Sequence, residues 1–203
     1  NYSSIIDFSS ETFIYESDIN NILQSGREWV GELFSNGDSK NINIPSPNLY
    51  NNDVTIILSA LSRSTDNSKF QISLNNNKVA ELNLEKINED LYGEKVIFSL
   101  DTFKIKINDL NNLNLSISYL GTSKSLAYLD YIILNYNSKL IFDSSQKVFN
   151  NLNEDASDKI QFNILSDIPN FKIWNITDPY LVINQLYDND IGKSIFNINS
   201  NRF

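Results

Sequence analysis

Alternation of apolar and polar residues is the feature that most limits how this chain can fold. In the segment DVTIILSALS nearly every second residue is apolar, and the same period recurs in KFQISLN, TFKIKIN and NLNLSISYL. Successive side chains of a β-strand point to opposite faces, so a period of two indicates a strand with one buried face. The residues expected to point inward are Val54, Ile56, Leu58, Ala60, Phe70, Ile72, Leu74, Phe103, Ile105, Ile107, Leu113, Leu115, Ile117 and Tyr119.

Short polar clusters separate these runs. Segments such as STDNSK, NNNK and INDLNN are rich in Asn, Asp and Ser, which favour turns. Strands that recur about every ten residues are typical of an all-β fold. We therefore predict an antiparallel β-sandwich, jelly-roll-like, with one or two short helices, for which the candidates are about 17–24 and 84–92.

The density of the strand patterns predicts the domain organisation. Residues 26–143 form the main strand field, preceded by an N-terminal lead-in over 1–25. Residues 144–203 begin with a break in the pattern and then carry the final strands and the exit of the chain. No Pro- or Gly-rich linker separates these parts, so a single domain over 1–203 is predicted. The chain contains no Met and begins with Asn, and we expect it to be a segment of a longer protein.

Two residue types are missing from the sequence, and this restricts its chemistry. Without Cys or His, the chain lacks thiolate nucleophiles, imidazole bases and the usual ligands of zinc. We expect no catalytic residues, no cofactor and no metal. The chain has 16 Lys and Arg against 25 Asp and Glu, a net charge of −9, which disfavours nucleic acid as a partner. No apolar run reaches the length of a membrane-spanning helix, so direct membrane insertion is not expected.

Three features resemble functional sites but have simpler explanations. Glu28 and Glu32 flank Trp29, an arrangement that suits the carboxylate pair of a glycosidase, yet residues four apart in a strand share one solvent face. The segment YDNDIG resembles the start of a calcium loop, but Asn199 stands where the loop needs an acidic ligand. Exposed tyrosines such as Tyr180 could stack on sugars, although most aromatic residues of a sandwich belong to its core or rim.

Three short motifs follow one another in a defined order. Their residues are Trp29, Gly31 and Glu32 in SGREWVGELFS, Leu129, Asp130 and Tyr131 in SLAYLDYIILNYNSKL, and Trp174, Thr177, Asp178 and Pro179 in FKIWNITDPY. The second motif lies about one hundred residues after the first, and the third follows after roughly thirty more. In order and spacing they resemble the β-sandwich region that precedes the catalytic domain in gingipain-related (C25) cysteine peptidases. The resemblance is greatest to the PorU-type sortases of the Bacteroidetes type IX secretion system.

The resemblance implies a non-catalytic accessory domain. In this family the catalytic Cys and His belong to a caspase-like peptidase domain, which would follow this region in the same protein and be its partner. Secreted substrate proteins, whose C-terminal signals the parent protein would process, and other secretion components are further implied partners. The implied location is the cell surface, on the extracellular face of the outer membrane. Asn175 departs from the family pattern, which more often has an acidic residue there, so an ion pair at this position is in doubt. A glycan-binding or adhesive β-sandwich module is the alternative.

Asp130 and Trp174 are assigned structural roles. In a regular strand Asp130 would share its face with Ile132, so its carboxylate is expected to accept hydrogen bonds from a neighbouring loop or to pair with Arg27 or a lysine. The strand around Trp174 carries large apolar side chains on both faces and ends at a proline. We interpret this segment as a junction with a following domain rather than as a ligand site.

Overall fold

The regular structure of the chain is β-strand. The computed structural model describes residues 4–22, 26, 29–45, 47–88, 93, 95–143, 146–150, 159–190 and 193–199. The strands among them are β1 Ser4–Ile6, β2 Phe8–Glu16, β3 Leu33–Ser35, β4 Ser39–Asn43, β5 Leu49–Ser62, β6 Ser68–Leu74, β7 Asn77–Leu84, β8 Ile97–Lys106, β9 Asn114–Leu120, β10 Leu126–Lys139, β11 Lys159–Leu165, β12 Ile173–Asn175, β13 Ile183–Gln185, β14 Asp188–Asp190 and β15 Lys193–Asn199. The all-β prediction is confirmed.

The two predicted helices are wrong wherever their residues are described. Residues 17–22 are not helical, and Asn20 instead forms an isolated bridge with Val30. Residues 85–88 follow the end of β7 without helical structure, while 23–24 and 89–92 lie outside the described residues. Helices this short are marginal without tertiary support, so pairing with neighbouring segments decides the conformation.

The chain divides into two compact units. Unit 1 comprises Asn1–Glu11 and Asn137–Phe203, and unit 2 comprises Thr12–Tyr136. β2 and β10 each contribute residues to both units, and the predicted limits near residues 25 and 143 stay a prediction. That residues 1–203 fold as one domain stays a prediction.

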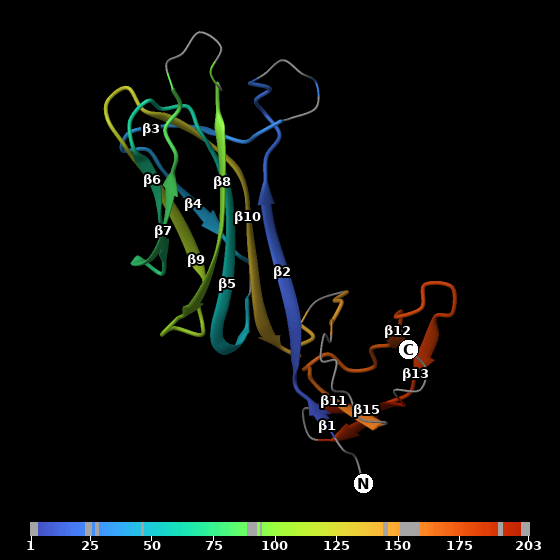
Figure 1. Cartoon of the computed structure of the whole chain (residues 1–203). Helices are drawn as coiled ribbons and strands as arrows, with labels where there is room; N and C mark the ends of the chain where they lie inside the picture. The colour runs from blue at the N-terminus through green and yellow to red at the C-terminus, as the bar shows by residue number, and fades with distance from the viewer. Residues whose placement is uncertain are drawn as a thin grey trace. The chain divides into compact units, whose positions relative to one another are not determined.

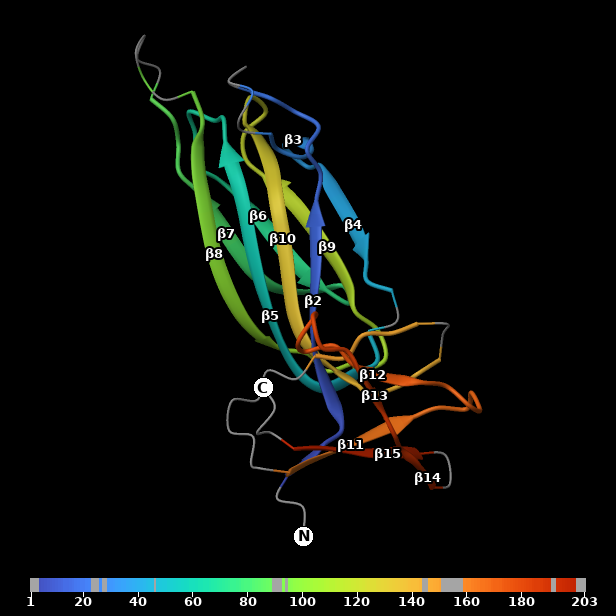
Figure 2. The same cartoon turned by 90° about the vertical axis from the view of Figure 1, so that its right-hand side faces the viewer.

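Unit 2 is a β-sandwich. One sheet has the order β2-β10-β5-β8, with β3 also paired to β10, and the other has the order β4-β9-β6-β7. Figures 1 and 2 show the two sheets layered on each other. Five strand pairs of this unit are antiparallel: β3 with β10, β4 with β9, β5 with β8, β6 with β7, and β6 with β9. Every residue predicted to point inward belongs to the core between the sheets or packs against it. The sandwich is thus confirmed, and its jelly-roll connectivity stays a prediction.

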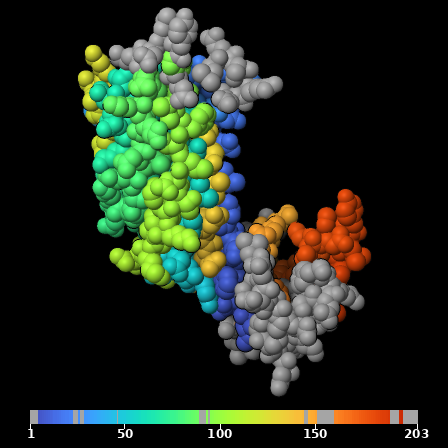
Figure 3. Space-filling model, in the orientation of Figure 1, coloured from blue at the N-terminus to red at the C-terminus, as the bar shows by residue number. Residues whose placement is uncertain are grey.

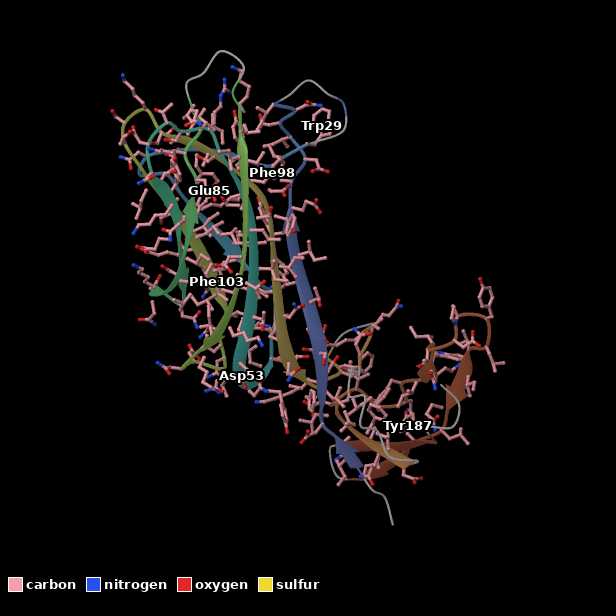
Figure 4. The ribbon with its side chains drawn as sticks, in the orientation of Figure 1. Trp29, Asp53, Glu85, Phe98, Phe103 and Tyr187 are labelled. Atoms are coloured by element: carbon pink, nitrogen blue, oxygen red, sulfur yellow. The ribbon has the colours of Figure 1, made fainter. Side chains whose placement is uncertain are left out.

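Unit 1 has a smaller sheet and a separate hairpin. The sheet has the order β1-β11-β15-β14, and β12 pairs with β13. β1 and β11 are parallel, whereas β11, β14 and β15 pair antiparallel. Ile160 and Ile164 belong to the small apolar core. The Phe171 ring packs against Phe142, with 5.0 Å between centroids, and against Tyr187, at 4.9 Å; Figure 4 labels Tyr187. This aromatic stack anchors the base of the hairpin.

Candidate functional site

The first two sequence motifs lie side by side in unit 2. The amide of Gly31 donates a hydrogen bond of 2.7 Å to the carbonyl of Leu129, and the amide of Leu129 donates one of 3.0 Å to the carbonyl of Glu32. These bonds continue the antiparallel pairing of β3 with β10, in which Leu33 lies opposite Tyr128. The structure therefore brings together two motifs that lie about one hundred residues apart in the sequence.

Gly31 leaves no room for a side chain. A Cβ atom at this position would lie 2.9 Å from the carbonyl oxygen of Leu129 and 3.0 Å from that of Ser17. The side-chain amide of Asn20 also donates a hydrogen bond of 2.6 Å to the Gly31 carbonyl. Such a close approach of backbone segments favours glycine. Trp29, by contrast, is about half exposed (Figure 4), so the motif uses Gly31 for packing and leaves Trp29 in contact with solvent.

Glu32 connects the two sheets of the sandwich. Its carboxylate accepts hydrogen bonds from the Tyr15 hydroxyl and the Lys40 ammonium group. Lys40 Nζ also lies 4.9 Å from the centre of the Tyr15 ring, within the range of a cation–π interaction. Tyr15 belongs to β2 and Lys40 to β4, which are strands of different sheets. The cluster therefore ties one sheet to the other.

The hydrogen bonds of this cluster favour the charged forms of Glu32 and Lys40. Burial raises the pKa of Glu32, but the hydrogen bonds from Lys40 and Tyr15 outweigh burial and hold that pKa below its ordinary value. Burial lowers the pKa of Lys40, and its bonds to Glu32 and Tyr15 reverse the effect, so the net shift is upward. Burial and the bond to Glu32 raise the pKa of Tyr15. A general acid or base works best with a pKa near the operating pH, so the cluster fits a structural ion pair better than a catalytic one.

Asp130 has a partner that the sequence did not reveal. Its carboxylate accepts a hydrogen bond of 2.7 Å from the Ser59 hydroxyl of the neighbouring strand β5. A loop amide, a lysine or Arg27 was the predicted partner of the Asp130 carboxylate. Among the described residues no loop amide and no lysine binds it, and Arg27 lies outside those residues.

The alternation of β10 breaks at Asp130. Leu129 and Ile132 both belong to the core, which leaves the two residues between them, Asp130 and Tyr131, outside it. One extra residue in a strand is the mark of a β-bulge. The expectation that Asp130 and Ile132 share a face is therefore wrong, and Asp130 escapes burial among core side chains.

The third motif forms a hairpin in unit 1. β12 pairs antiparallel with β13, and the turn between them is held by side chains. The Asn175 side chain accepts a hydrogen bond of 3.0 Å from the amide of Thr177, and the Asp178 carboxylate accepts one of 2.9 Å from the amide of Tyr180. Pro179 lies within this turn. Asn and Asp side chains that bond the backbone two residues on are typical of turns, so Asn175 has a local role without any ion pair.

One face of this hairpin is exposed and carries four apolar residues around Asn184, which lies opposite Trp174. Trp174 is 52% exposed, and Ile176, Val182 and Leu186, which continue the alternation of the two strands on the same side, are exposed as well. We call these four residues the hairpin face. Tyr180, at the turn, is 98% exposed. Figure 3 shows the hairpin in orange and red at the surface. The opposite side, with Ile173, packs against the core of unit 1.

Sequence reasoning missed the three residues that hold the acidic groups of the motifs. Tyr15 and Lys40 bind Glu32, and Ser59 binds Asp130. In the sequence each is an ordinary strand residue, because its partner is fixed only by the order of strands in the sheets. No signal short of that order could have identified them.

The described residues include no group of three or more acidic, His or Cys side chains placed to hold a metal ion. Within the same part of the chain, no helix has the length and apolarity needed to cross a membrane.

Comparison with known proteins gives a likeness of fold. No protein-family model and no curated protein matches the sequence. Among solved structures, dimeric latent PorU from Porphyromonas gingivalis matches with a TM-score of 0.79 and 16% identity, over 98% of this chain and 19% of that chain. This chain therefore spans about a fifth of the length of that structure.

Two carbohydrate-binding modules match less well. The CBM36-1 domain of a multidomain xylanase from the hindgut metagenome of Trinervitermes trinervoides has a TM-score of 0.41 and 14% identity, over 61% of this chain and 96% of that one. A family 35 module from Clostridium thermocellum has a TM-score of 0.38 and 11% identity, over 64% and 95%. TM-scores this low carry no argument. The fold that the comparisons support for this chain is a PorU-like β-sandwich region.

Proposed function

We propose that this chain is a non-catalytic accessory domain of a larger, secretion-linked cysteine peptidase of the gingipain-related type, most like the PorU-type sortases. The observation that carries the proposal is the likeness of fold to PorU over 98% of the chain. The order of the three sequence motifs supports the same family. Because the chain has neither Cys nor His, the nucleophile and the base of such a peptidase would have to come from another domain.

The contacts of the first two motifs support a structural role. Gly31 and Leu129 bind each other through their backbones, and Glu32 and Asp130 bind side chains of neighbouring strands. All these groups are used in holding the sandwich together. The chain would then act by supporting and orienting a catalytic domain, or by presenting substrates to it.

The hairpin face is the surface that we assign to the catalytic domain. Apolar strand faces are normally covered, and an exposed apolar patch on a folded protein marks an interaction surface. Trp174 and Leu186 lie on that face and are exposed in this chain. The partner proposed is the caspase-like peptidase domain of the same protein. Secreted proteins whose C-terminal signals the parent processes, and other secretion components, are further proposed partners at the extracellular face of the outer membrane.

The proposal is tested by comparing this chain with its parent. The gene should also encode a caspase-like segment with Cys and His, and the isolated 203-residue chain should hydrolyse no peptide substrate. Peptide hydrolysis that copurifies with the folded chain would contradict the proposal. A parent that consists only of repeated sandwich domains would contradict it as well.

A glycan-binding or adhesive module is the second candidate. It is favoured by the exposure of Trp174 and of Tyr180, which is 98% exposed, because sugar rings stack on accessible aromatic side chains. The aliphatic side chains of Ile176, Val182 and Leu186 on the same hairpin fit a protein partner better. A change in Trp174 fluorescence on addition of oligosaccharides would favour this second function over the first.

A further inference from the structure

The outer face of the sheet β2-β10-β5-β8 is the side that points away from the core of unit 2, and Figure 2 shows this sheet in front. Its residues alternate with those of the core. On β5, Ser59 lies between the core residues Leu58 and Ala60. On β10, Ile133 lies between the core residues Ile132 and Leu134. The composition of this outer face can therefore be read strand by strand.

Three large apolar side chains are exposed on the outer face. Phe98 and Leu100 of β8 are 50% and 60% exposed, and Ile14 of β2 is 57% exposed. Phe98 and Leu100 lie opposite Leu61 and Ser59 of β5, and directly opposed residues share a face. Ser59 is buried, and Leu61 is buried in a second cluster with Val30 and Tyr128 on this side of the sheet, so Phe98 and Leu100 lie at the margin of the part that the chain itself covers. Figure 3 shows β8 in yellow-green at the surface, and Figure 4 labels Phe98 near one end of that strand. The open face of an antiparallel sheet is usually polar, so these residues mark an interaction surface.

Half-buried residues connect these side chains into one apolar area. Two side-chain hydrogen bonds, from Thr12 and Ser10 of β2 to asparagines of β10, follow in antiparallel order. Ile14 therefore lies opposite Ile133. Ile57 of β5, on the same outer face, is half-buried as well. Apolar side chains thus occur on all four strands of the outer face, with Thr102 opposite Ile57 and Ser59 opposite Leu100 among them.

Asp130 places a carboxylate within this apolar area. It is bound by Ser59, which lies opposite Leu100, so the three residues form a row across β10, β5 and β8. Lys104 lies opposite Thr55, two rows further along the sheet. A partner that covered this area would remove the Asp130 carboxylate from water, and among the described residues the Ser59 hydroxyl is the donor that binds it. A carboxylate is costly to bury in this way unless a cation pairs with it.

We propose that the outer face binds a polypeptide segment that carries one Arg or Lys between apolar residues. The apolar residues would cover Phe98 and Leu100, and the cation would pair with Asp130. An Arg guanidinium offers two parallel donors to a carboxylate. The net charge of −9 also favours a cationic segment over an acidic one. This surface consists of unit 2 residues alone and is independent of the role assigned to the hairpin face.

The probe is a pair of blocked tripeptides, acetyl-Leu-Arg-Leu-amide and the same peptide with neutral citrulline in place of Arg. Each is titrated into the isotope-labelled 203-residue chain and followed by amide NMR signals. The arginine peptide should bind with a dissociation constant in the millimolar range and shift the signals of Phe98, Leu100 and Asp130. The citrulline peptide should bind about fivefold more weakly, the effect expected of one modest ion pair.

Three variants make the result specific. Asp130→Asn keeps the shape of the side chain and should abolish the preference for the arginine peptide. Asp101→Asn is the matched control, since Asp101 is an exposed carboxylate of β8 opposite the core residue Leu58, and it should keep the preference. Leu100→Ser, at a position that is 60% exposed, should weaken the binding of both peptides. Absence of binding, equal affinity for the two peptides, or a preference that survives in Asp130→Asn would overturn the proposal.

Discussion

The amide nitrogen of Gly31 lies 2.7 Å from the carbonyl oxygen of Leu129, and this hydrogen bond joins the first sequence motif to the second. Each of these residues is followed in the chain by an acid, Glu32 and Asp130. The backbone contact therefore positions both carboxylates, one toward Tyr15 and Lys40 and the other toward Ser59. The two motifs act as one structural element of the sandwich.

Gly31→Ala is expected to lower the free energy of unfolding by about 1–3 kcal/mol, the usual cost of overpacking. The new methyl group would meet two backbone oxygens, at 2.9 and 3.0 Å, and neither can rotate away. Urea denaturation measures the change. Ser39→Ala, at an exposed position in β4, serves as the control and should stay within about 0.5 kcal/mol of the parent. Overlapping curves for Gly31→Ala and the parent would refute the close approach.

Asp130→Ala is expected to destabilise the chain by about 1–3 kcal/mol, because it leaves the buried Ser59 hydroxyl without its acceptor. Ser59→Ala removes the other half of the pair. In a double-mutant cycle the two changes should be non-additive, with a coupling of at least about 0.5 kcal/mol. Strict additivity would show that the hydrogen bond contributes nothing to stability, and an unchanged denaturation midpoint would show that Asp130 is merely solvated.

Glu32 should make stability depend on pH in the acid range. Its pKa is held below the ordinary value in the folded chain, so its contribution is complete above the unfolded pKa of about 4.3 and is lost as the pH falls through the folded pKa. The stability difference between the parent and Glu32→Gln should be constant near neutral pH and shrink on acidification below about pH 4.3. Urea midpoints of both proteins at several pH values measure it.

Lys40→Met supplies the control for this pH dependence. Without the ammonium group that binds Glu32, the change from Glu32 to Gln should have a smaller effect, and that effect should vary less with pH. A difference that persists undiminished in the Lys40→Met background would assign the pH dependence to other groups.

The sequence predicts well which strand residues are buried where apolar and polar residues alternate regularly. The inward positions of β5, β6 and β9 are buried as the alternation indicated, from Val54 and Phe70 to Tyr119. The break at Asp130 and Tyr131 could not be foreseen, because a β-bulge shifts the alternation by one residue without a mark in the sequence. The prediction of short helices failed, where its residues are described, for a related reason. Pairing between distant segments overrides a weak local preference for helix.

The candidate site was only half predictable. The sequence identified Glu32 and Asp130 as members of two motifs, but their partners Tyr15, Lys40 and Ser59 come from strands whose neighbours depend on sheet order. The exposure of the hairpin face was foreseen in part, because large apolar residues occupy both sides of the strand around Trp174.

The predicted single domain can be tested with the two tryptophans of the chain. Trp29 belongs to unit 2 and Trp174 to unit 1, so Trp174→Phe and Trp29→Phe variants each report on one unit by fluorescence. If residues 1–203 unfold cooperatively, the two variants should give coincident urea transitions, and circular dichroism should follow the same curve. Separate midpoints for the two probes would show two independent folding units.

The accessory role is tested most directly by the accessibility of Trp174 to acrylamide in a Trp29→Phe background. In the isolated chain Trp174 is 52% exposed and should be quenched readily. In the parent protein with its peptidase domain it should be protected, while Trp29, measured in Trp174→Phe, should keep its accessibility. Equal quenching of Trp174 in the isolated chain and in the parent would contradict docking of a catalytic domain on the hairpin face.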